Sequence, residues 1–398
     1  MEYQLANRVS SLKPSIIREI LKNSSDPEMI PFSAGNPAPE AFPVEAIQEI
    51  SARILKDNPI LALQYNLTEG YTPLRNTLKQ YMASHHNSFR EEQDELIVTT
   101  GAQQVMDLAT KVLCNEGDVV VCEAPTFIGS LNTFRSYNCV LKGVPMDEDG
   151  INLEQLDKTL TENPGAKLLY VIPNFQNPSG ITMSLEKRKG VYALAKKHNI
   201  MILEDNPYGD LRVSGEHLPT IKSMDEDGIV IYAGTFSKVI SSGMRVGFAI
   251  APKPIMQKMV VGKQCSDVHT TVWSQIICDE FINHYDYDGH LQKLVEIYRK
   301  KSTLMLNAID QHLVPLGITH TKVEGGLFVW CTLPDSIDML TFCSEAVKRK
   351  VCVVPGSAFL TDESQPCQSF RMNFSTPTDE NIVKGVETLG QLAKDMMA

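Results

Sequence analysis

One lysine of the chain stands among side chains that suit a phosphorylated aldehyde. Lys238 follows the hydroxyls of Thr235 and Ser237 and precedes the guanidinium of Arg245, all within residues 234–248. Hydroxyl donors and a fork-shaped cation bind phosphate well, and a neighbouring amine can form an imine with an aldehyde that carries the phosphate. We therefore predict a site for pyridoxal 5'-phosphate (PLP), with Lys238 as the imine-forming lysine. The alternative is a surface loop with a solvated lysine.

A PLP site also needs a carboxylate against the pyridine nitrogen, because the protonated ring acts as the electron sink. The apolar run from residue 200 predicts a buried strand that ends at Glu204 and Asp205. Side chains alternate along a strand, so only one of the two faces the site. We predict Asp205 for this position, with Glu204 as the competing candidate and an acidic strand end facing water as the remaining alternative. Tyr208 follows after a proline and can bind the phenolic oxygen of the cofactor.

Three other strand ends carry groups that the cofactor needs. The turn after the strand at 167–172 contains Asn174 and Asn177, whose amides suit the phenolic oxygen. Gly101 leads from a strand into a helix, whose free N–H groups form an anion site. Phe127 lies just past another strand and can stack on a ring. Each signal alone is common in proteins without such a site, but the set favours one.

A sheet must hold these positions, and the chain predicts one. From about residue 46 to 285, short apolar runs alternate with amphipathic stretches such as 103–113 and 185–198. This alternation is typical of an α/β fold, with a mostly parallel sheet covered by helices on both faces. We expect seven strands, at 95–99, 118–122, 139–144, 167–172, 200–204, 229–233 and 246–251. Ligands of open α/β sheets bind at the carboxyl edge, where Lys238 is predicted to lie.

The chain divides into three parts. Residues 46–285 are expected to form the large PLP-binding domain, and residues 286–398 a smaller α+β domain with strands at 327–332, 351–354 and 369–373. A long helical pattern at 291–313 is our candidate for the connection between the two. The proline-rich residues 1–45 are expected to form an arm that contributes to the small domain and to a lid over the site.

Composition excludes several classes of function. A chain of 398 residues that is 43% hydrophobic can bury a large core. The net charge of −11 argues against a nucleic-acid partner, and no run of about 18 apolar residues predicts a membrane span. The amino terminus shows no export or organelle signal. The nine cysteines lack a Cys-x-x-Cys pair and the nine histidines form no cluster, so we expect a cytoplasmic protein without a metal site.

Three motifs carry a resemblance to a known family. They are Pro173-Asn-x-x-Asn-Pro-x-Gly180, Glu204-Asp-x-Pro-Tyr208, and Ser237-Lys238 followed by Gly243-x-Arg-x-Gly247. With them the chain resembles the fold-type I PLP-dependent aminotransferases of class I and II, most of all the kynurenine/2-aminoadipate aminotransferase branch. The resemblance extends from Phe32 to Phe374 and implies an aspartate-aminotransferase-like fold.

The resemblance implies roles for individual residues. Lys238 would form the imine and move the proton, and Asp205 would bind the pyridine nitrogen. Asn177 and Tyr208 would bind the phenolic oxygen. The expected phosphate contacts are Ala102, Gln103, Thr235, Ser237 and Arg245. Arg371 would hold the substrate α-carboxylate, helped by Asn177 and the backbone at Gly35.

The resemblance also implies a homodimer with shared active sites, because Tyr65 would reach the phosphate of the neighbouring subunit. This branch carries tyrosine where the chain has Phe127. Ring stacking is retained by the phenylalanine, but any hydrogen bond from that hydroxyl is lost.

The expected reaction is a ping-pong transamination through the aldimine of Lys238. It would move the amino group of an aromatic or 2-aminoadipate-like amino acid to a 2-oxo acid such as 2-oxoglutarate. A PLP-dependent C–S β-lyase is one alternative. A non-catalytic PLP-sensing module of a regulator is another, although residues 1–45 are too short for the basic winged-helix domain of such proteins. The substrate side chain is expected to meet the arm at residues 8–17, where Arg8 either pairs with an acidic group or is solvated.

Overall fold

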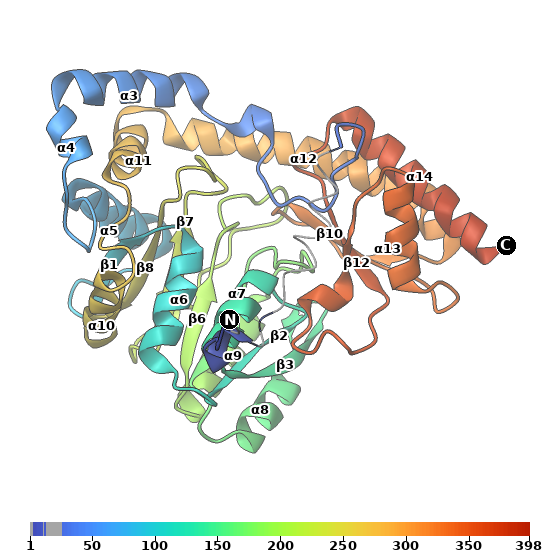
Figure 1. The fold of residues 1–398 in the computed structure, drawn as a ribbon, viewed down its shortest axis with the longest axis horizontal. Coiled ribbons are helices and arrows are strands. Elements are labelled where there is room, and N and C mark those ends of the chain that lie inside the picture. The colour runs from blue at the N-terminus through green and yellow to red at the C-terminus, as the bar shows by residue number, and fades with distance from the viewer. Residues whose placement is uncertain (1–2, 11, 13–25) are drawn as a thin grey trace.

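The structure is a computed structural model that describes residues 3–10, 12 and 26–398. Its large sheet has the order β1-β8-β7-β6-β5-β2-β3-β4 (Figure 1). The strands are β1 Asp94–Thr99, β2 Val119–Ala124, β3 Val140–Asp147, β4 Gly150–Ile151, β5 Leu168–Val171, β6 Met201–Asp205, β7 Val230–Thr235 and β8 Gly247–Pro252. The run from β3 to β7 is parallel, whereas β8 is antiparallel to both its neighbours. The seven predicted strands are present, and the two-residue β4 is an eighth that is too short to leave an apolar pattern.

Helices cover both faces of this sheet, as the sequence predicts. The helices in the first 284 residues are α1 Asn7–Ser10, α3 Val44–Asp57, α4 Pro59–Leu63, α5 Thr72–His86, α6 Ala102–Leu113, α7 Ile128–Ser136, α8 Leu153–Glu162, α9 Leu185–Lys197, α10 Lys253–Gln264 and α11 Val272–His284. Alternate residues of the central strands enter different clusters: Leu203 packs with α6, α7 and α10, and Ile202 packs with α8 and α9.

A second, antiparallel sheet has the order β11-β12-β10-β9 and lies beside the first. Its strands are β9 Thr319–His320, β10 Phe328–Thr332, β11 Val354–Pro355 and β12 Ser369–Asn373, and its helices are α13 Met339–Lys348 and α14 Asp379–Met397. Short 3-10 turns complete the elements, at Pro39–Ala41, Lys222–Met224, Val314–Leu316 and Gly356–Phe359.

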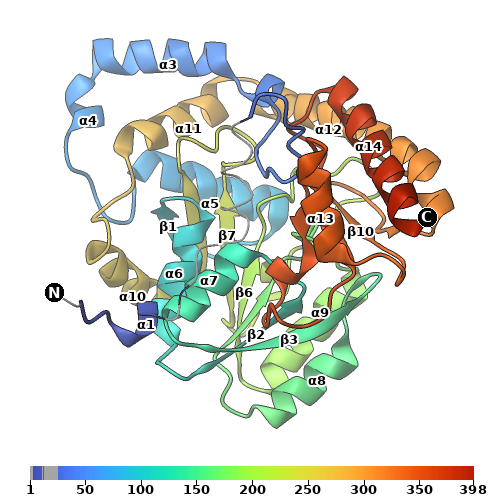
Figure 2. The same ribbon diagram turned by 45° about the vertical axis from the view of Figure 1, so that its right-hand side comes forward.

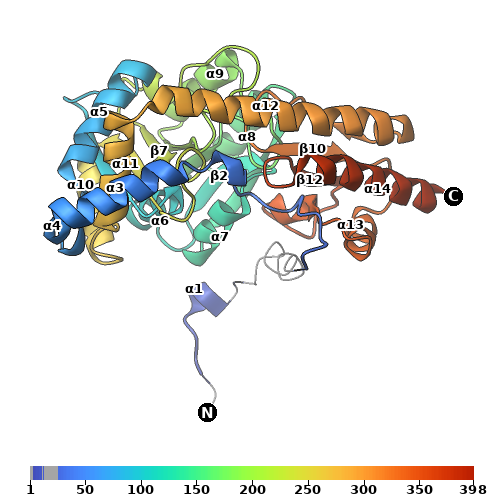
Figure 3. The same cartoon turned by 90° about the horizontal axis from the view of Figure 1, so that it is seen from above.

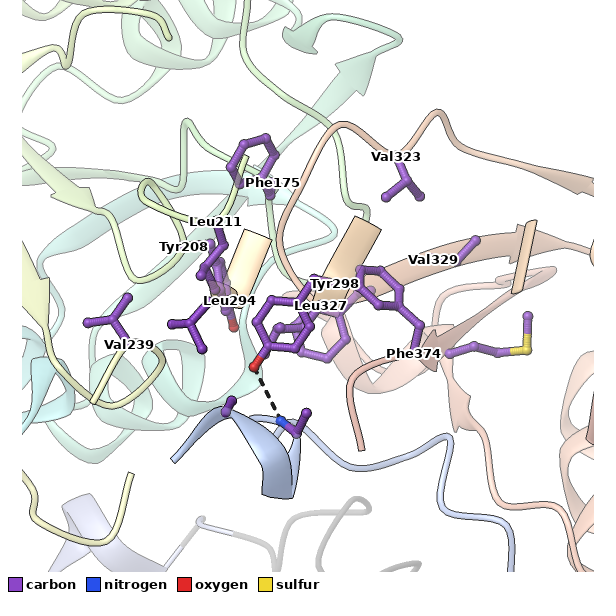
Figure 4. Close-up of a cluster of buried hydrophobic side chains, with 14 of the residues drawn as sticks. Phe175, Tyr208, Leu211, Val239, Leu294, Tyr298, Val323, Leu327, Val329 and Phe374 are labelled. Atoms are coloured by element: carbon purple, nitrogen blue, oxygen red, sulfur yellow. Dashed lines mark hydrogen bonds between the residues drawn. The ribbon is translucent and has the colours of Figure 1, made fainter. Parts of the chain in front are cut away.

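Helix α12, Tyr287–His312, runs along both parts of the molecule (Figure 3). It begins before the predicted residue 291 because Asp286 caps it, accepting a hydrogen bond from the Gly289 amide. Leu294 and Tyr298 of this helix pack in a core that reaches both sheets (Figure 4). The Tyr298 hydroxyl accepts a bond of 3.2 Å from the Ala38 amide. The helix therefore connects the two sheets and the segment that precedes α3.

The predicted amino-terminal arm is described only in part. Residues 13–25 lie outside the described residues, and with them most of the segment 8–17 expected to meet the substrate. Helix α1 packs against α7 (Figure 2). Further on, Ile30 forms a parallel bridge with Val351, and Phe32 accepts a backbone bond of 2.8 Å from Asn373. Within the described residues no helix has the length and apolar character needed to cross a membrane.

Candidate active site

A cavity of about 500 Å³ lies where the carboxyl ends of β6 and β7 face the small sheet. Most of the residues predicted to bind cofactor or substrate line it: Gly35, Ala102, Gln103, Phe127, Asn177, Asp205, Tyr208, Thr235, Ser237, Lys238, Arg245 and Arg371. Asn174, Tyr65 and Arg8 do not. These residues come from both sheets and from the segment before α3, so the fold brings together positions more than 300 apart in the chain.

Lys238 follows β7 and carries an activated amine. Its Nζ donates to the carbonyl of Gly35 at 2.7 Å. Burial, with smaller contributions from the guanidinium groups of Arg371 and Arg245, lowers its pKa to about 8. About a tenth of this amine is therefore uncharged at pH 7, far more than at its ordinary pKa, and the uncharged form is the one that acts as a nucleophile.

Asp205 ends β6 with one of its oxygens unpaired. Its Oδ2 accepts from the Tyr170 hydroxyl at 2.7 Å, whereas its buried Oδ1 has no hydrogen-bond partner among the described residues. Burial raises its pKa to about 7, opposed by the Tyr170 bond and by the charge of Lys238. A buried oxygen of this kind calls for a donor. Glu204 points to the other face, where it accepts from the Ile221 and Lys222 amides, so the alternation selects Asp205.

The expected phosphate contacts form a group of donors beside Lys238. Arg245 Nη1 donates to the Ser237 hydroxyl at 3.1 Å, and the Thr235 hydroxyl donates to the same oxygen at 3.0 Å. Gly101 has a φ of 74°, and a Cβ there would lie 2.2 Å from Arg245 Nη2. Only glycine leaves room for the guanidinium.

The N-terminus of α6 faces the same cavity. No side chain caps it, so its first amides are available to an anion. The Gln103 side chain is engaged elsewhere, since its Nε2 donates to the Gly129 carbonyl at 3.0 Å. At Ala102 and Gln103 the backbone is therefore the group suited to phosphate.

Arg371 of β12 is buried, and part of its guanidinium group has no hydrogen-bond partner. It donates to Asn177 Oδ1 at 2.8 Å and to the Ser33 carbonyl at 3.0 Å, while its Nε has no partner among the described residues. The guanidinium lies over the Phe328 ring at 4.1 Å and near the Phe359 ring at 5.0 Å. Burial lowers its pKa to about 10, which leaves it charged at neutral pH. Such a fork suits a carboxylate.

The remaining predicted contacts divide into those inside the cavity and those outside it. Phe127 precedes α7 and lines the cavity, as does the buried Tyr208, whose ring meets Phe328 edge-on at 5.9 Å. Burial raises the pKa of the Tyr208 hydroxyl well above its usual range. Asn174 is not among the lining residues; its amide donates to Asn206 at 2.9 Å and accepts from Arg188 at 2.7 Å. Of the two amides, only Asn177 serves the cavity.

Two predicted residues lie away from this cavity. Tyr65 is 81% exposed and contacts the His269 ring edge-on at 5.7 Å. Arg8 lies in α1, close enough to Tyr137 to influence the pKa of that hydroxyl. Neither lines the cavity of its own chain.

Sequence reasoning missed four residues: Ser33, Tyr170, Phe328 and Phe359. Tyr170 binds Asp205, and the other three surround the Arg371 guanidinium. Their sequence signal is weak, because a buried aromatic residue such as Tyr170, Phe328 or Phe359 is typical of a core, and Ser33 acts through its backbone carbonyl.

The residues of the cavity fit PLP as a group. The unpaired Oδ1 of Asp205 matches the N–H of a protonated pyridine, and the donors around Arg245 match a phosphate. Lys238 offers an amine with a lowered pKa to the aldehyde. Among the described residues no cluster could hold a metal ion.

Known proteins of similar sequence identify the family of this chain. Residues 27–389 match the family described as aminotransferase class I and II. The chain is 38% identical over 400 residues to aromatic-amino-acid aminotransferase 1 of Thermococcus litoralis, covering 100% of this chain and 95% of that protein. It is 35% identical to 2-aminoadipate transaminase of Thermus thermophilus, covering 97% and 96%.

A solved structure is similar to this chain in both fold and sequence. Pyrococcus horikoshii kynurenine aminotransferase, in complex with PMP, KYN and KYA, superposes with a TM-score of 0.95 at 34% identity, covering 99% of this chain and 98% of that one. The fold is the aspartate-aminotransferase-like α/β fold that the sequence predicted.

Proposed function

The chain belongs to the class I and II aminotransferases, and from that premise we propose that its amino donor is an aromatic or 2-aminoadipate-like amino acid and its acceptor a 2-oxo acid such as 2-oxoglutarate. The protein is a PLP-dependent aminotransferase, as its sequence predicted. The observation that carries the assignment of the reaction to this site is the convergence of Lys238, Asp205 and Arg371 on one cavity of about 500 Å³; the donor class is supported by the apolar cavity wall and by the relatives.

PLP, when bound, supplies an aldehyde for the amino group and a ring that accepts electrons. The chain's own residues then have separate tasks. The Arg371 fork binds the substrate α-carboxylate, next to Asn177 and the backbone at Gly35. With the carboxylate fixed, Lys238 Nζ takes the proton from the substrate α-carbon and returns it as a general acid. The lowered pKa of Lys238 supports this task.

Other residues orient the cofactor. Asp205 Oδ1 keeps the ring nitrogen protonated, while Asn177 and Tyr208 bind the phenolic oxygen. Phe127 stacks on the ring. The phosphate is bound by the amides of Ala102 and Gln103, the hydroxyls of Thr235 and Ser237, and the guanidinium of Arg245. The unused Oδ1 and the uncapped helix start support these assignments.

The walls of the cavity support an aromatic donor. Phe127, Phe328, Met106 and Ile172 line it beyond the polar groups, and such surfaces bury apolar side chains favourably. The two curated relatives act, by their names, on aromatic amino acids and on 2-aminoadipate. The phenylalanine at 127 keeps the stacking surface without adding a hydroxyl.

The working unit is proposed to be a homodimer with shared sites. Tyr65 is 81% exposed beside the exposed Ile60, Leu63 and Leu67, which supports burial of this surface by a second copy. We assign residues 46–285 to the large domain and 286–398 to the small one, with residues 1–45 as an arm and lid. The α12 connection supports that division. Nine free cysteines support a reducing, cytoplasmic location.

The direct test is a panel of amino donors with 2-oxoglutarate, monitored by formation of glutamate. Aromatic amino acids and 2-aminoadipate are expected to be the best donors. The Lys238→Ala variant should lose turnover and the visible absorbance of the bound cofactor, and an active alanine variant would refute the assignment. Pyruvate and ammonia released from cystathionine without an acceptor would favour a β-lyase, and PLP binding without any turnover would favour a sensor.

The shared site is tested by mixing two inactive variants. Tyr65→Ala and Lys238→Ala subunits are combined under conditions that exchange subunits. If Tyr65 serves the partner's site, the mixed dimer contains one site with both residues intact, and activity returns. If Tyr65 serves its own site, mixing restores nothing; a Tyr65→Ala variant that is fully active before mixing would show that Tyr65 serves neither site.

A further inference from the structure

The Asp205 carboxylate is held from behind by a buried tyrosine. The Tyr170 hydroxyl donates to Asp205 Oδ2 at 2.7 Å, and the Tyr170 side chain has no exposed surface. Tyr170 is not among the residues that line the cavity. Any effect that it has on the reaction must therefore pass through Asp205.

The strand register explains why the two side chains meet. Strands β5 and β6 are parallel neighbours in which Tyr170 pairs with Leu203. Asp205 lies two residues beyond Leu203 and so shares its face of the sheet. The other residues of β5 are the aliphatic Leu168, Leu169 and Val171. Tyr170 thus brings the one side-chain hydroxyl of this strand to the edge where the carboxylate ends the next.

Packing keeps this hydroxyl in place. Phe134 of α7 contacts the Tyr170 ring edge-on at 5.5 Å, and both belong to the core beneath α6 and α7. Burial raises the pKa of Tyr170 well above its usual range, so the hydroxyl keeps its proton and remains a donor. A permanent donor on Oδ2 leaves Oδ1 as the oxygen that faces a ligand, and Oδ1 is the atom without a partner.

We infer that Tyr170 is a positioning residue for transamination: its hydroxyl fixes the Asp205 carboxylate with Oδ1 toward the ring nitrogen and keeps the shared proton on that nitrogen. The inference rests on the proposed placement of Asp205 at the ring. A donor to Oδ2 stabilises the carboxylate and makes Asp205 a weaker base. Without it, the proton moves from the ring toward the carboxylate, and the ring becomes a poorer electron sink.

The purely structural alternative is that Tyr170 only fills the core. Tyr170→Phe separates the two, because phenylalanine retains the ring that packs on Phe134 and removes only the hydroxyl. A core-filling role predicts a change in thermal stability and nothing at the cofactor. The positioning role predicts a change in the protonation of the cofactor itself.

The test is NMR of enzyme reconstituted with PLP labelled at the ring nitrogen, recorded against pH, since the chemical shift reports whether that nitrogen is protonated. Transfer of the proton within the pair takes up none from solvent, so the effect appears as the fraction of ring nitrogen that is protonated at a given pH near neutrality. In the Tyr170→Phe variant the ratio of protonated to unprotonated nitrogen should fall by about tenfold or more, because a bond to a charged acceptor contributes roughly that much to an equilibrium. Binding of pyridoxamine phosphate, measured by equilibrium dialysis, should weaken by about tenfold. A protonated fraction that equals that of the wild type would overturn the inference, whatever happens to stability.

Two matched variants make every outcome decisive. Tyr232→Phe removes a buried hydroxyl of β7 that accepts a bond of 2.9 Å from Asn206 and lies on the Glu204 face of the sheet; its protonated fraction should equal that of the wild type. Asp205→Ala should itself lower the protonated fraction. If it does not, the placement of Asp205 at the ring fails; if it does and Tyr170→Phe has no effect, only the role of Tyr170 fails.

A second substitution covers the case in which Tyr170→Phe does not fold. Replacing Tyr170 by 3-fluorotyrosine retains its ring and hydroxyl and makes the hydroxyl a stronger donor. The protonated fraction of the ring nitrogen should then rise, opposite to the phenylalanine variant. An unchanged or lowered fraction in a folded protein would contradict the inference.

Discussion

Replacing Arg371 with lysine separates the charge of this residue from its shape. The arginine donates hydrogen bonds to Asn177 Oδ1 at 2.8 Å and to the Ser33 carbonyl at 3.0 Å, and its Nε has no partner among the described residues. A lysine keeps the positive charge but has one nitrogen, so it cannot hold these two acceptors and a carboxylate in one plane. The substrate then loses at least one of two charged hydrogen bonds.

The magnitude follows from that single bond. A hydrogen bond to a charged group contributes about 1.5–3 kcal/mol, so kcat/KM should fall about 10- to 150-fold. The loss should be equal for every amino donor and for the 2-oxo acid, because all of them carry the same α-carboxylate. It should appear mainly in KM, since the carboxylate is bound in the ground state as well as in the transition state.

The assay is steady-state kinetics with at least three donors of different side chains, normalised to bound PLP. Arg349→Lys is the matched control, because Arg349 forms an ion pair with Asp395 at 2.8 Å on the small domain. It lies away from the proposed positions of the substrate and the cofactor. Its kcat/KM should not change. A loss in Arg371→Lys that is confined to one donor would refute the reasoning, because Arg371 would then recognise side chains.

Three other perturbations have defined outcomes. Burial lowers the pKa of Lys238 to about 8 from its ordinary 10.5, so covalent capture of PLP by apoprotein in the presence of borohydride should rise with pH and level off just above 8; a rate that keeps rising toward 10.5 contradicts this. Gly101→Ala would place a Cβ 2.2 Å from Arg245 Nη2, so PLP affinity should fall by tenfold or more (about 1.4 kcal/mol) in equilibrium dialysis, and an unchanged affinity would contradict the phosphate assignment. Burial raises the pKa of Glu123 to about 8 from 4.5. Between these two pH values the folded state keeps a proton on Glu123 that the unfolded state has lost, so wild-type stability falls as the pH rises across that range. Thermal unfolding of Glu123→Gln should lack this fall, and parallel curves for the two proteins would contradict it.

Sequence patterns predicted the polar groups at strand ends, because each of these positions depends only on one strand and the turn that follows it. A buried parallel strand is a short apolar run, and the polar residues in the turn after it mark the edge where ligands bind. Asp205, Asn177 and Lys238 all lie at or shortly after the end of such a run. The predicted strand at 369–373 coincides with β12, whereas the apolar run at 351–354 joins the small sheet only over Val354–Pro355 and forms an isolated bridge to Ile30 at Val351. Hydrogen bonding across the sheet, and not apolarity, decides where a strand begins.

The residues that sequence analysis missed share one property: each acts across elements whose register is not written in either element alone. Tyr170 reaches Asp205 because β5 pairs with β6 so that Tyr170 faces Leu203, and a slip by one residue would turn it to the other face. Phe328 meets Arg371 because β10 and β12 are neighbours in the small sheet. Alternation along β6 places Glu204 and Asp205 on opposite faces of the sheet, and the packing of other elements on each face decides which of the two reaches the cavity. A single strand therefore predicts which polar groups are present at its end, while the pairing of strands determines how those groups are oriented. Asp205 shows both: its presence follows from β6 alone, and its orientation by Tyr170 follows from the pairing of β5 with β6.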